Sequence, residues 1–208
     1  VKSPSMAPFE VQVAPLPGQV RPATVELKTQ SALGQLAVER DAVVDAGVQG
    51  SITLTAGQRV NVEGHLRAQA GRVTVALERG NLSGAVASSI EAHEQRAVAL
   101  GSHARIDVAG VSNVIENAQG VRSGAVLDAG SVTLDAPTGT LAVSAGAFID
   151  ARGARDALDL TVGGVRQRTE VASRGGAVSL AAQQGLFVLG TADAHGGSSA
   201  VDGGRLSV

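Results

Sequence analysis

The chain contains no cysteine, no tryptophan and no tyrosine, and only three of its 208 residues are phenylalanine. Without cysteine it can form no disulfide, no thiolate metal site and no cysteine nucleophile. A protein that crosses the periplasm and then an outer-membrane pore gains from this lack, since a disulfide formed on the way would block its passage. The missing cysteines are therefore compatible with secretion.

The scarcity of large rings also limits the kind of core that the chain can build. A globular core of this size normally uses several aromatic side chains to fill its centre. A narrow core of stacked Val, Ile, Leu and Ala does not need them. The 27 glycines, together with frequent Val, Ser and Thr, indicate short strands separated by turns.

The charge pattern argues against a nucleic-acid-binding protein, and the hydropathy argues against a membrane-spanning helix. The 17 basic and 19 acidic residues are scattered singly and give a net charge of −2. With no basic stripe and no aromatic stacking platform, we expect no nucleic-acid partner. No apolar run approaches the roughly 20 residues of a membrane helix, and the N-terminus has no signal-peptide pattern. Because the chain starts without Met and stops within a predicted strand, we expect it to be an internal segment of a longer protein.

A short signature recurs along the chain: a branched or small residue, then Asp, one or two further residues, and Gly. Its five copies are Val44–Gly47, Ile106–Gly110, Leu127–Gly130, Ile149–Gly153 and Ala192–Gly196. Around three of them a longer unit repeats, with first halves at Gly50–Leu54, Gly130–Leu134 and Gly176–Leu180 and second halves at Val60–Gly64, Leu141–Ala145 and Leu186–Gly190. Such self-similarity is typical of a solenoid.

Apolar and polar residues alternate in short runs from Thr24 onward, which is the strand pattern with one buried face. The runs include Ile52–Leu54, Val132–Leu134 and Leu160–Val162, and we find no Asn-Gly or Asp-Gly hairpin turn between the runs. We therefore predict an all-β fold, a right-handed parallel β-helix (β-solenoid) of short strands with coils of about 20 residues. Seven to nine coils would make a rod of about 35–45 Å.

The distribution of proline divides the chain into two parts. Five of the six prolines lie in residues 1–24, which we interpret as a proline-rich linker or irregular edge segment. Residues 25–208 are predicted to be β-helix repeats. Departures from the repeat predict loops outside the coil at Gly80–His93, Ser112–Gly124 and Ala154–Gly175. A capping-box pattern at Ser88–Glu91 would allow a short helix over 92–100, but we favour a strand at Ala97–Leu100.

The recurring Asp is the most tempting candidate site. If the coils stack in register, Asp107, Asp150 and Asp193 share one edge, where they could bind Ca²⁺ or act as acid and base on a glycan. The alternative, which we favour, is that each Asp accepts a hydrogen bond from an amide two residues on and so closes its own turn.

The remaining candidates are weaker. His65, His93, His103 and His195 lack the spacing of a helical zinc site and are expected to be solvated. The pairs beginning at Gly163, Gly175, Gly196 and Gly203 form no nucleotide-binding motif and are interpreted as corners. Asn81 begins the one Asn-x-Ser/Thr sequon, and its glycosylation is left open. No residue is assigned a catalytic, cofactor-binding or metal-binding role.

The repeats resemble a known family. Gly-Ser-Val-Thr-Leu-Asp-Ala units alternating with Leu-x-Val segments and Gly-Gly closures look like the repeat region of filamentous haemagglutinin-like exoproteins. The closest stretches are Gly50–Gly71, Gln95–Gly110, Gly130–Gly153 and Gly175–Val208. The resemblance implies a large Gram-negative adhesin, secreted to the cell surface through an outer-membrane transporter by two-partner secretion. The secretion domain of that family is not recognisable here.

We therefore expect a non-enzymatic, monomeric rod segment that presents loops, above all Gly80–His93 and Ala154–Gly175, to an unidentified host-cell or surface receptor of protein or glycan. One alternative is a solenoid polysaccharide lyase or hydrolase, which the lack of Tyr and Trp disfavours. Another is the stalk of a contact-dependent toxin-delivery exoprotein, which would share the same rod.

Overall fold

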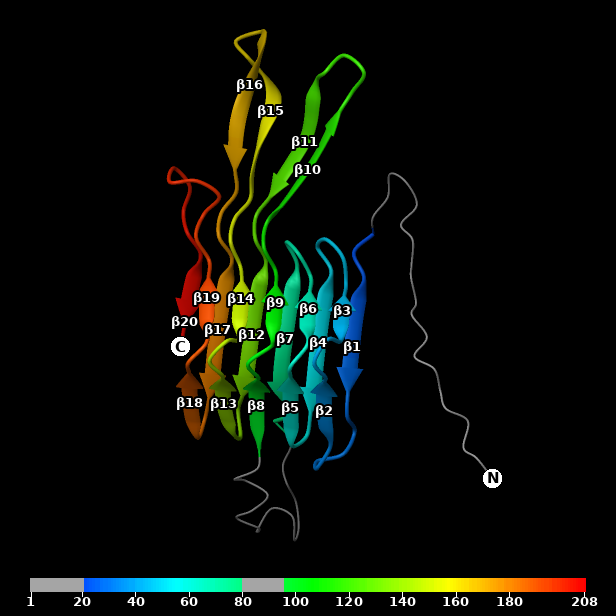
Figure 1. The fold of residues 1–208 in the computed structure, drawn as a ribbon, viewed down its shortest axis with the longest axis vertical. Helices are drawn as coiled ribbons and strands as arrows, with labels where there is room; N and C mark the ends of the chain where they lie inside the picture. The colour runs from blue at the N-terminus through cyan, green and yellow to red at the C-terminus, as the bar shows by residue number, and fades with distance from the viewer. Residues whose placement is uncertain (1–20, 80–95) are drawn as a thin grey trace, which may run out of the picture.

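The computed structural model describes residues 21–79 and 96–208 of the chain, and within them it is all-β, with twenty strands and no helix. Most strands are short and pair in parallel with strands from other parts of the sequence (Figure 1). The predicted strand at Ala97–Leu100 is present as β8, so these four residues are not helical. Residues 1–20 and the predicted loop at Gly80–His93, with Asn81 and His93, lie outside the described residues.

Three parallel sheets form the body of the molecule. The first is ordered β1-β4-β7-β12-β17-β20 and comprises Thr24–Lys28, Ser51–Ala56, Arg72–Leu77, Ser131–Ala136, Ala177–Ala182 and Arg205–Ser207. The second is ordered β2-β5-β8-β13-β18 and comprises Gln35–Val38, Arg59–Val62, Ala97–Leu100, Thr140–Val143 and Gly185–Val188. The third is ordered β3-β6-β9-β14-β19 and comprises Val43–Asp45, His65–Arg67, Arg105–Asp107, Phe148–Asp150 and Thr191–Asp193.

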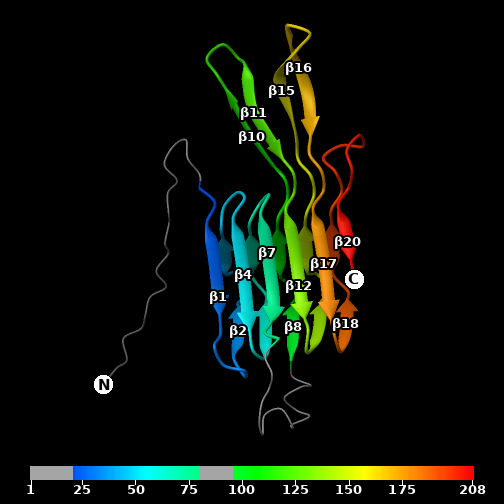
Figure 2. The same ribbon diagram turned by 180° about the vertical axis from the view of Figure 1, so that it is seen from behind.

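The chain visits the three sheets in turn and then returns to the first, an arrangement consistent with a β-solenoid. Figure 2, the view from behind, shows the strands of the first sheet side by side. The described strands fall into five such sets of three, and β20 begins a sixth. Six rungs at about 4.8 Å span roughly 24 Å. The described residues thus form fewer rungs than the expected seven to nine coils and a shorter stack than the expected rod of about 35–45 Å, because many residues leave the coils instead of adding rungs.

The core is a column of aliphatic side chains that follows the rungs. Ile52 pairs with Val73, Val73 with Val132, and Val132 with Val178. All four are buried, with at most 1% of each residue exposed. The prediction that Ile52, Val132 and Val178 stack on one inner face is confirmed, and the small width of the column explains why few aromatic rings are needed.

A column of glycines marks the corner where the chain enters the first sheet. It comprises Gly50, Gly71, Gly130, Gly176 and Gly204. A Cβ atom on Gly130 would lie 1.9 Å from the carbonyl oxygen of Gly71, which accepts a hydrogen bond from the amide of Ser131. The coils approach so closely here that no side chain fits, which explains the glycine that opens each repeat.

Two antiparallel hairpins leave the coils at this same corner (Figure 1). One joins β10 (Val111–Glu116) to β11 (Arg122–Leu127), and the other joins β15 (Arg155–Val162) to β16 (Val165–Ala172). The sequence correctly predicted that these segments leave the coil, but the prediction of loops was wrong. The strand predicted at Leu160–Val162 is confirmed, as part of β15.

Candidate functional site

The two hairpins form the most prominent feature outside the coils and include one of the segments expected to carry binding. Both extend from the same end of the parallel sheets and lie beside each other in Figures 1 and 2. β15 of the second hairpin contacts both strands of the first. The site is therefore a paired unit made of segments some 40 residues apart in the sequence.

Each hairpin has a turn that its own residues specify. Gly163 and Gly164 have φ values of 60° and 83°, and Val162 pairs with Val165 across them. Two left-handed residues in a two-residue loop are the mark of a type I′ hairpin turn, which glycine adopts without strain. In the first hairpin the side chain of Asn117 accepts hydrogen bonds from the amides of Gln119 (3.0 Å) and Val121 (2.9 Å).

A carboxylate on the second hairpin, Asp156, fastens it to the first. It accepts hydrogen bonds from the hydroxyl of Ser112 on β10 and from Nη2 of Arg122 on β11, the latter over 2.6 Å. Its own neighbour Ala157 donates a third bond from its amide over 2.7 Å. The hydrogen bonds from Ser112 and Ala157, together with the charge of Arg122, hold the pKa of Asp156 below its usual range.

A second carboxylate, Asp159, completes the clamp between the hairpins. Arg168, its partner across β15 and β16, donates to both of its oxygens over 3.0 Å. The amide of Arg122 donates to it over 2.7 Å, and Arg168 also reaches the carbonyl oxygen of Gly120 over 2.9 Å. The bonds from Arg168 and the Arg122 amide lower the pKa of Asp159 to about 2. We call Asp156, Asp159, Arg122 and Arg168 the hairpin clamp.

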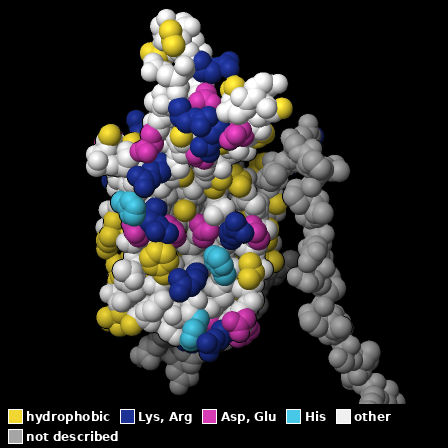
Figure 3. Space-filling model, turned by 45° about the horizontal axis from the view of Figure 1, so that its top comes forward, with side chains coloured by type: hydrophobic (Ala, Val, Ile, Leu, Met, Phe, Trp, Pro, Cys, Tyr) yellow, Lys and Arg dark blue, Asp and Glu magenta, His cyan; other side chains and the backbone are white. Residues whose placement is uncertain are grey.

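Apolar side chains occupy the outer part of this unit. Ile115 is 69% exposed, Val162 53% and Val165 66%. Val162 and Val165 flank the Gly163-Gly164 turn, at the distal end of the second hairpin. Figure 3 shows apolar side chains at this end of the molecule and intermingled basic and acidic groups nearer the coils. The hairpin clamp thus joins two hairpins whose outer parts expose apolar side chains. We call Ile115, on the first hairpin, and Val162 and Val165, on the second, the apolar tip.

Three of the recurring aspartates lie in one row along the third sheet, as predicted. Asp107 pairs with Asp150, and Asp150 with Asp193. Each accepts a hydrogen bond from the amide two residues on, over 3.0, 3.2 and 3.3 Å respectively. The prediction that they close their own turns is confirmed. Asp45 does the same with the amide of Gly47, over 2.8 Å.

Cationic side chains offset the repulsion within this row. Nε and Nη2 of Arg152 donate to the two oxygens of Asp150 over 2.9 and 2.5 Å. Burial by itself raises the pKa of Asp150, but the hydrogen bonds from Arg152 outweigh it and bring that pKa below its usual value. Nδ1 of His195 lies 2.7 Å from Asp193. Among the described residues, no three His, Asp or Glu side chains come together as a set of metal ligands.

The histidines and glycine pairs considered in the sequence do not gather into a site. His65 is the half-buried first residue of β6 rather than a turn residue. His103 is exposed, with its Nδ1 3.1 Å from the hydroxyl of Ser102 and 3.5 Å from Glu63. Of the glycine pairs interpreted as corners, the Gly163 pair is instead a hairpin turn.

The hairpin clamp was not predicted from the sequence. One signal for it was present, because a two-residue turn at Gly163-Gly164 sets Asp159 opposite Arg168. The contacts to Ser112 and Arg122 depend on how two separate insertions meet in space, which no local pattern encodes. Comparisons with protein-family models, curated proteins and solved structures return no match to this chain.

Proposed function

We propose that this chain is a structural rod segment of a large secreted bacterial surface adhesin, in which stacked coils present the paired hairpins for attachment to a host cell or another surface. The observation that carries the proposal is the hairpin clamp. It fixes an exposed apolar tip on a scaffold of parallel sheets, and binding residues in proteins are commonly held this way, on projections from a rigid body.

The proposal includes the finer architecture of a right-handed β-helix with coils of about 20 residues. Ile52 pairs with Val73, 21 residues later, which supports that coil size. Paired residues on successive rungs lie farther apart in the sequence where a hairpin is inserted between them, as for Val132 and Val178. Right-handed crossovers are strongly favoured between parallel strands, because the strands themselves twist in one sense.

The proposal places the protein at the bacterial surface, after export through an outer-membrane transporter, as the family resemblance implies. The lack of cysteine supports it for the reason given above. The segment acts as a monomer toward an unidentified protein or glycan receptor and has no nucleic-acid partner. The resemblance to filamentous haemagglutinin-like exoproteins remains part of this proposal.

The proposal assigns no enzymatic role. A glycoside hydrolase of the two-carboxylate type needs one carboxyl group with a raised pKa to act as general acid. The pKa of Asp150 is lowered instead, and that of Asp159 lies at about 2. Both carboxylates are held by arginine, Asp150 by Arg152 and Asp159 by Arg168. These observations support a structural role for the acidic residues.

Adhesion of coated beads tests this function. Beads carrying the 208-residue chain should bind cultured epithelial cells, and the triple variant Ile115→Ser, Val162→Ser, Val165→Ser should bind several-fold less. Phe187, which is 62% exposed on β18 at the opposite end of the strands, supplies the matched control Phe187→Ser. Equal adhesion by wild type and triple variant would contradict the attachment role and favour the alternative of a passive toxin-delivery stalk.

A further inference from the structure

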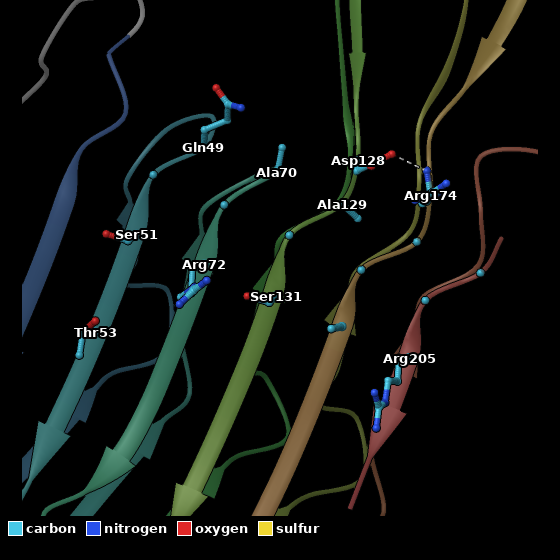
Figure 4. A pocket seen from close by; sticks show the side chains of 18 residues that line it. Gln49, Ser51, Thr53, Ala70, Arg72, Asp128, Ala129, Ser131, Arg174 and Arg205 are labelled. Atoms are coloured by element: carbon cyan, nitrogen blue, oxygen red, sulfur yellow. Dashed lines mark hydrogen bonds between the residues drawn. The ribbon is translucent and has the colours of Figure 1, made fainter. Parts of the chain in front are cut away.

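A shallow groove crosses the first sheet at the foot of the hairpins. It runs over the corner of five successive rungs, from Ser51 on β4 to Arg205 on β20, and Asp128 and Arg174 lie at its upper rim (Figure 4). Its length along the rungs is about 19 Å, from the spacing of parallel strands. The groove goes beyond the proposed attachment site, because it does not include the apolar tip.

Backbone and small side chains make up much of the floor of the groove. The glycine column provides one part of it, where the backbone itself is the surface. Beside the glycines runs a row of paired residues, one from each rung: Ser51, Arg72, Ser131, Ala177 and Arg205. Three of these five are small. A ligand lying along this row can therefore come within contact distance of the main chain.

Three exposed guanidinium groups line the groove. Arg72 and Arg205 replace the serine that opens the repeat on the β4 and β12 rungs, and Arg174 follows β16. Within the two ranges that the structure describes, none of the three side chains has an acidic partner. The one carboxylate in the lining, Asp128, accepts a hydrogen bond from the amide of Arg174, not from its side chain.

The density and position of these charges indicate the kind of anion that fits. Arg72 and Arg205 stand three rungs apart, about 14 Å along the groove. Such widely spaced cations, with Asp128 among them, suit a polymer with well-separated negative charges better than a densely sulfated one. Guanidinium forks match carboxylates in geometry, and the hydroxyls of Ser51 and Ser131 can exchange hydrogen bonds with sugar hydroxyls.

We propose that this groove binds a linear polysaccharide of uronic acids, laid across the rungs with its carboxylates against Arg72, Arg174 and Arg205. No aromatic ring lines the groove, so the stacking that holds neutral sugars is absent and the charged groups determine binding. The polymer lies extended along the groove because the row of paired residues crosses rungs of equal spacing.

Calorimetric titration of the full 208-residue chain with galacturonic acid oligomers of defined length tests the proposal. Arg72→Ser and Arg205→Ser are suitable variants, since serine is the residue that the repeat itself has at this position. Each should weaken binding at least threefold, and the double variant more than tenfold. Arg40→Ser is the matched control, because Arg40 is exposed and lines a different hollow; it should leave the affinity unchanged.

Two further experiments distinguish binding in the groove from nonspecific electrostatic attraction. Ser131→Phe keeps the charge but blocks the floor between the two arginines, and it should abolish binding while circular dichroism stays unchanged. Carboxyl-reduced, neutral oligomers should not bind. Equal binding by the double variant, equal binding of the neutral oligomers, or tighter binding of heparin-type sulfated oligomers would each overturn the proposal, whatever the result of the bead assay.

Discussion

The carboxylate of Asp128 accepts a hydrogen bond from the amide of Arg174 over 2.8 Å, which joins the end of the first hairpin to the end of the second. The adjacent Ala129 amide donates to the carbonyl oxygen of Arg174 over 3.1 Å. Asp128 carries the same short signature as Asp150, yet it links two insertions instead of closing its own turn. The hairpins are thus fastened at their feet as well as by the hairpin clamp.

The hairpin clamp should depend on pH only under strongly acidic conditions. Asp159 has a pKa of about 2 in the folded state, below the value of about 3.9 for an unfolded chain. Its stabilising contribution is therefore complete above about pH 4 and is lost as the pH falls toward about 2. The carboxyl ¹³C shift of Asp159 should titrate with a midpoint near 2. A midpoint near 4 would mean that Arg168 and the Arg122 amide do not hold this carboxylate.

Replacing Val132 by Asp should destabilise the coils severely. Val132 is 1% exposed within the aliphatic column, so the new carboxylate would be buried without a partner, at a cost of several kcal/mol. Thr133→Asp is the matched control, because Thr133 points to the other face of the same strand and is half-buried. Thermal unfolding should show a large fall in Tm for the first variant and a small change for the second. Similar Tm values for both would show that the register is wrong.

The glycine column should tolerate no side chain. Gly130→Ala would bring a methyl group within 1.9 Å of the Gly71 carbonyl oxygen, so neighbouring rungs would have to move apart. Gly203→Ala is the comparison, since its added methyl would have no neighbour nearer than 3.6 Å. We expect a loss of about 1–3 kcal/mol for Gly130→Ala, as for other overpacked sites, and less than about 1 kcal/mol for Gly203→Ala. Chemical denaturation measures both, and equal stability would refute the close approach.

The sequence was most informative where the repeat was regular. Ile52, Val132 and Val178 follow equivalent glycines, and period-two alternation was enough to place them inside. The unit that begins at Arg72 was not counted as a copy, because arginine stands where two of the copies have serine and the third has alanine, although the alternation from Val73 onward did predict a strand there. The repeat predicts the buried face well, because every rung needs apolar residues there. It predicts the outer face poorly, because the outward residues are free to vary.

The candidate sites were predictable only where they are local. The hydrogen bond that Asp150 accepts from the amide two residues on is a property of its own turn, and the sequence predicted it correctly. The contact of Asp156 with Ser112 links residues 44 positions apart, at the meeting of two insertions. Hairpin length and orientation decide such a contact, and neither is encoded in the repeat.

The aspartate row should need no metal. Asn at position 150 would keep the hydrogen bond from the Arg152 amide, and the lost ion pair contributes little because the Arg152 side chain is 45% exposed. Asp150→Asn should therefore cost at most about 1 kcal/mol. The Tm of the wild type should be the same with a chelator and with excess Ca²⁺. A rise in Tm with Ca²⁺ that Asp150→Asn removes would establish a metal site instead.

The stack of six in-register rungs is the claim on which the rest depends, and one distance tests it. Glu26 on β1 and Ser207 on β20 end an outward-facing row that continues through Thr53, Thr74, Thr133 and Ser179. Because the chain has no cysteine, Glu26→Cys and Ser207→Cys would place two spin labels without ambiguity. Pulsed dipolar spectroscopy should give a narrow distribution centred near the roughly 24 Å between these rungs, within the reach of the label linkers. A mean of 35 Å or more, or a broad distribution, would contradict the stack of six rungs.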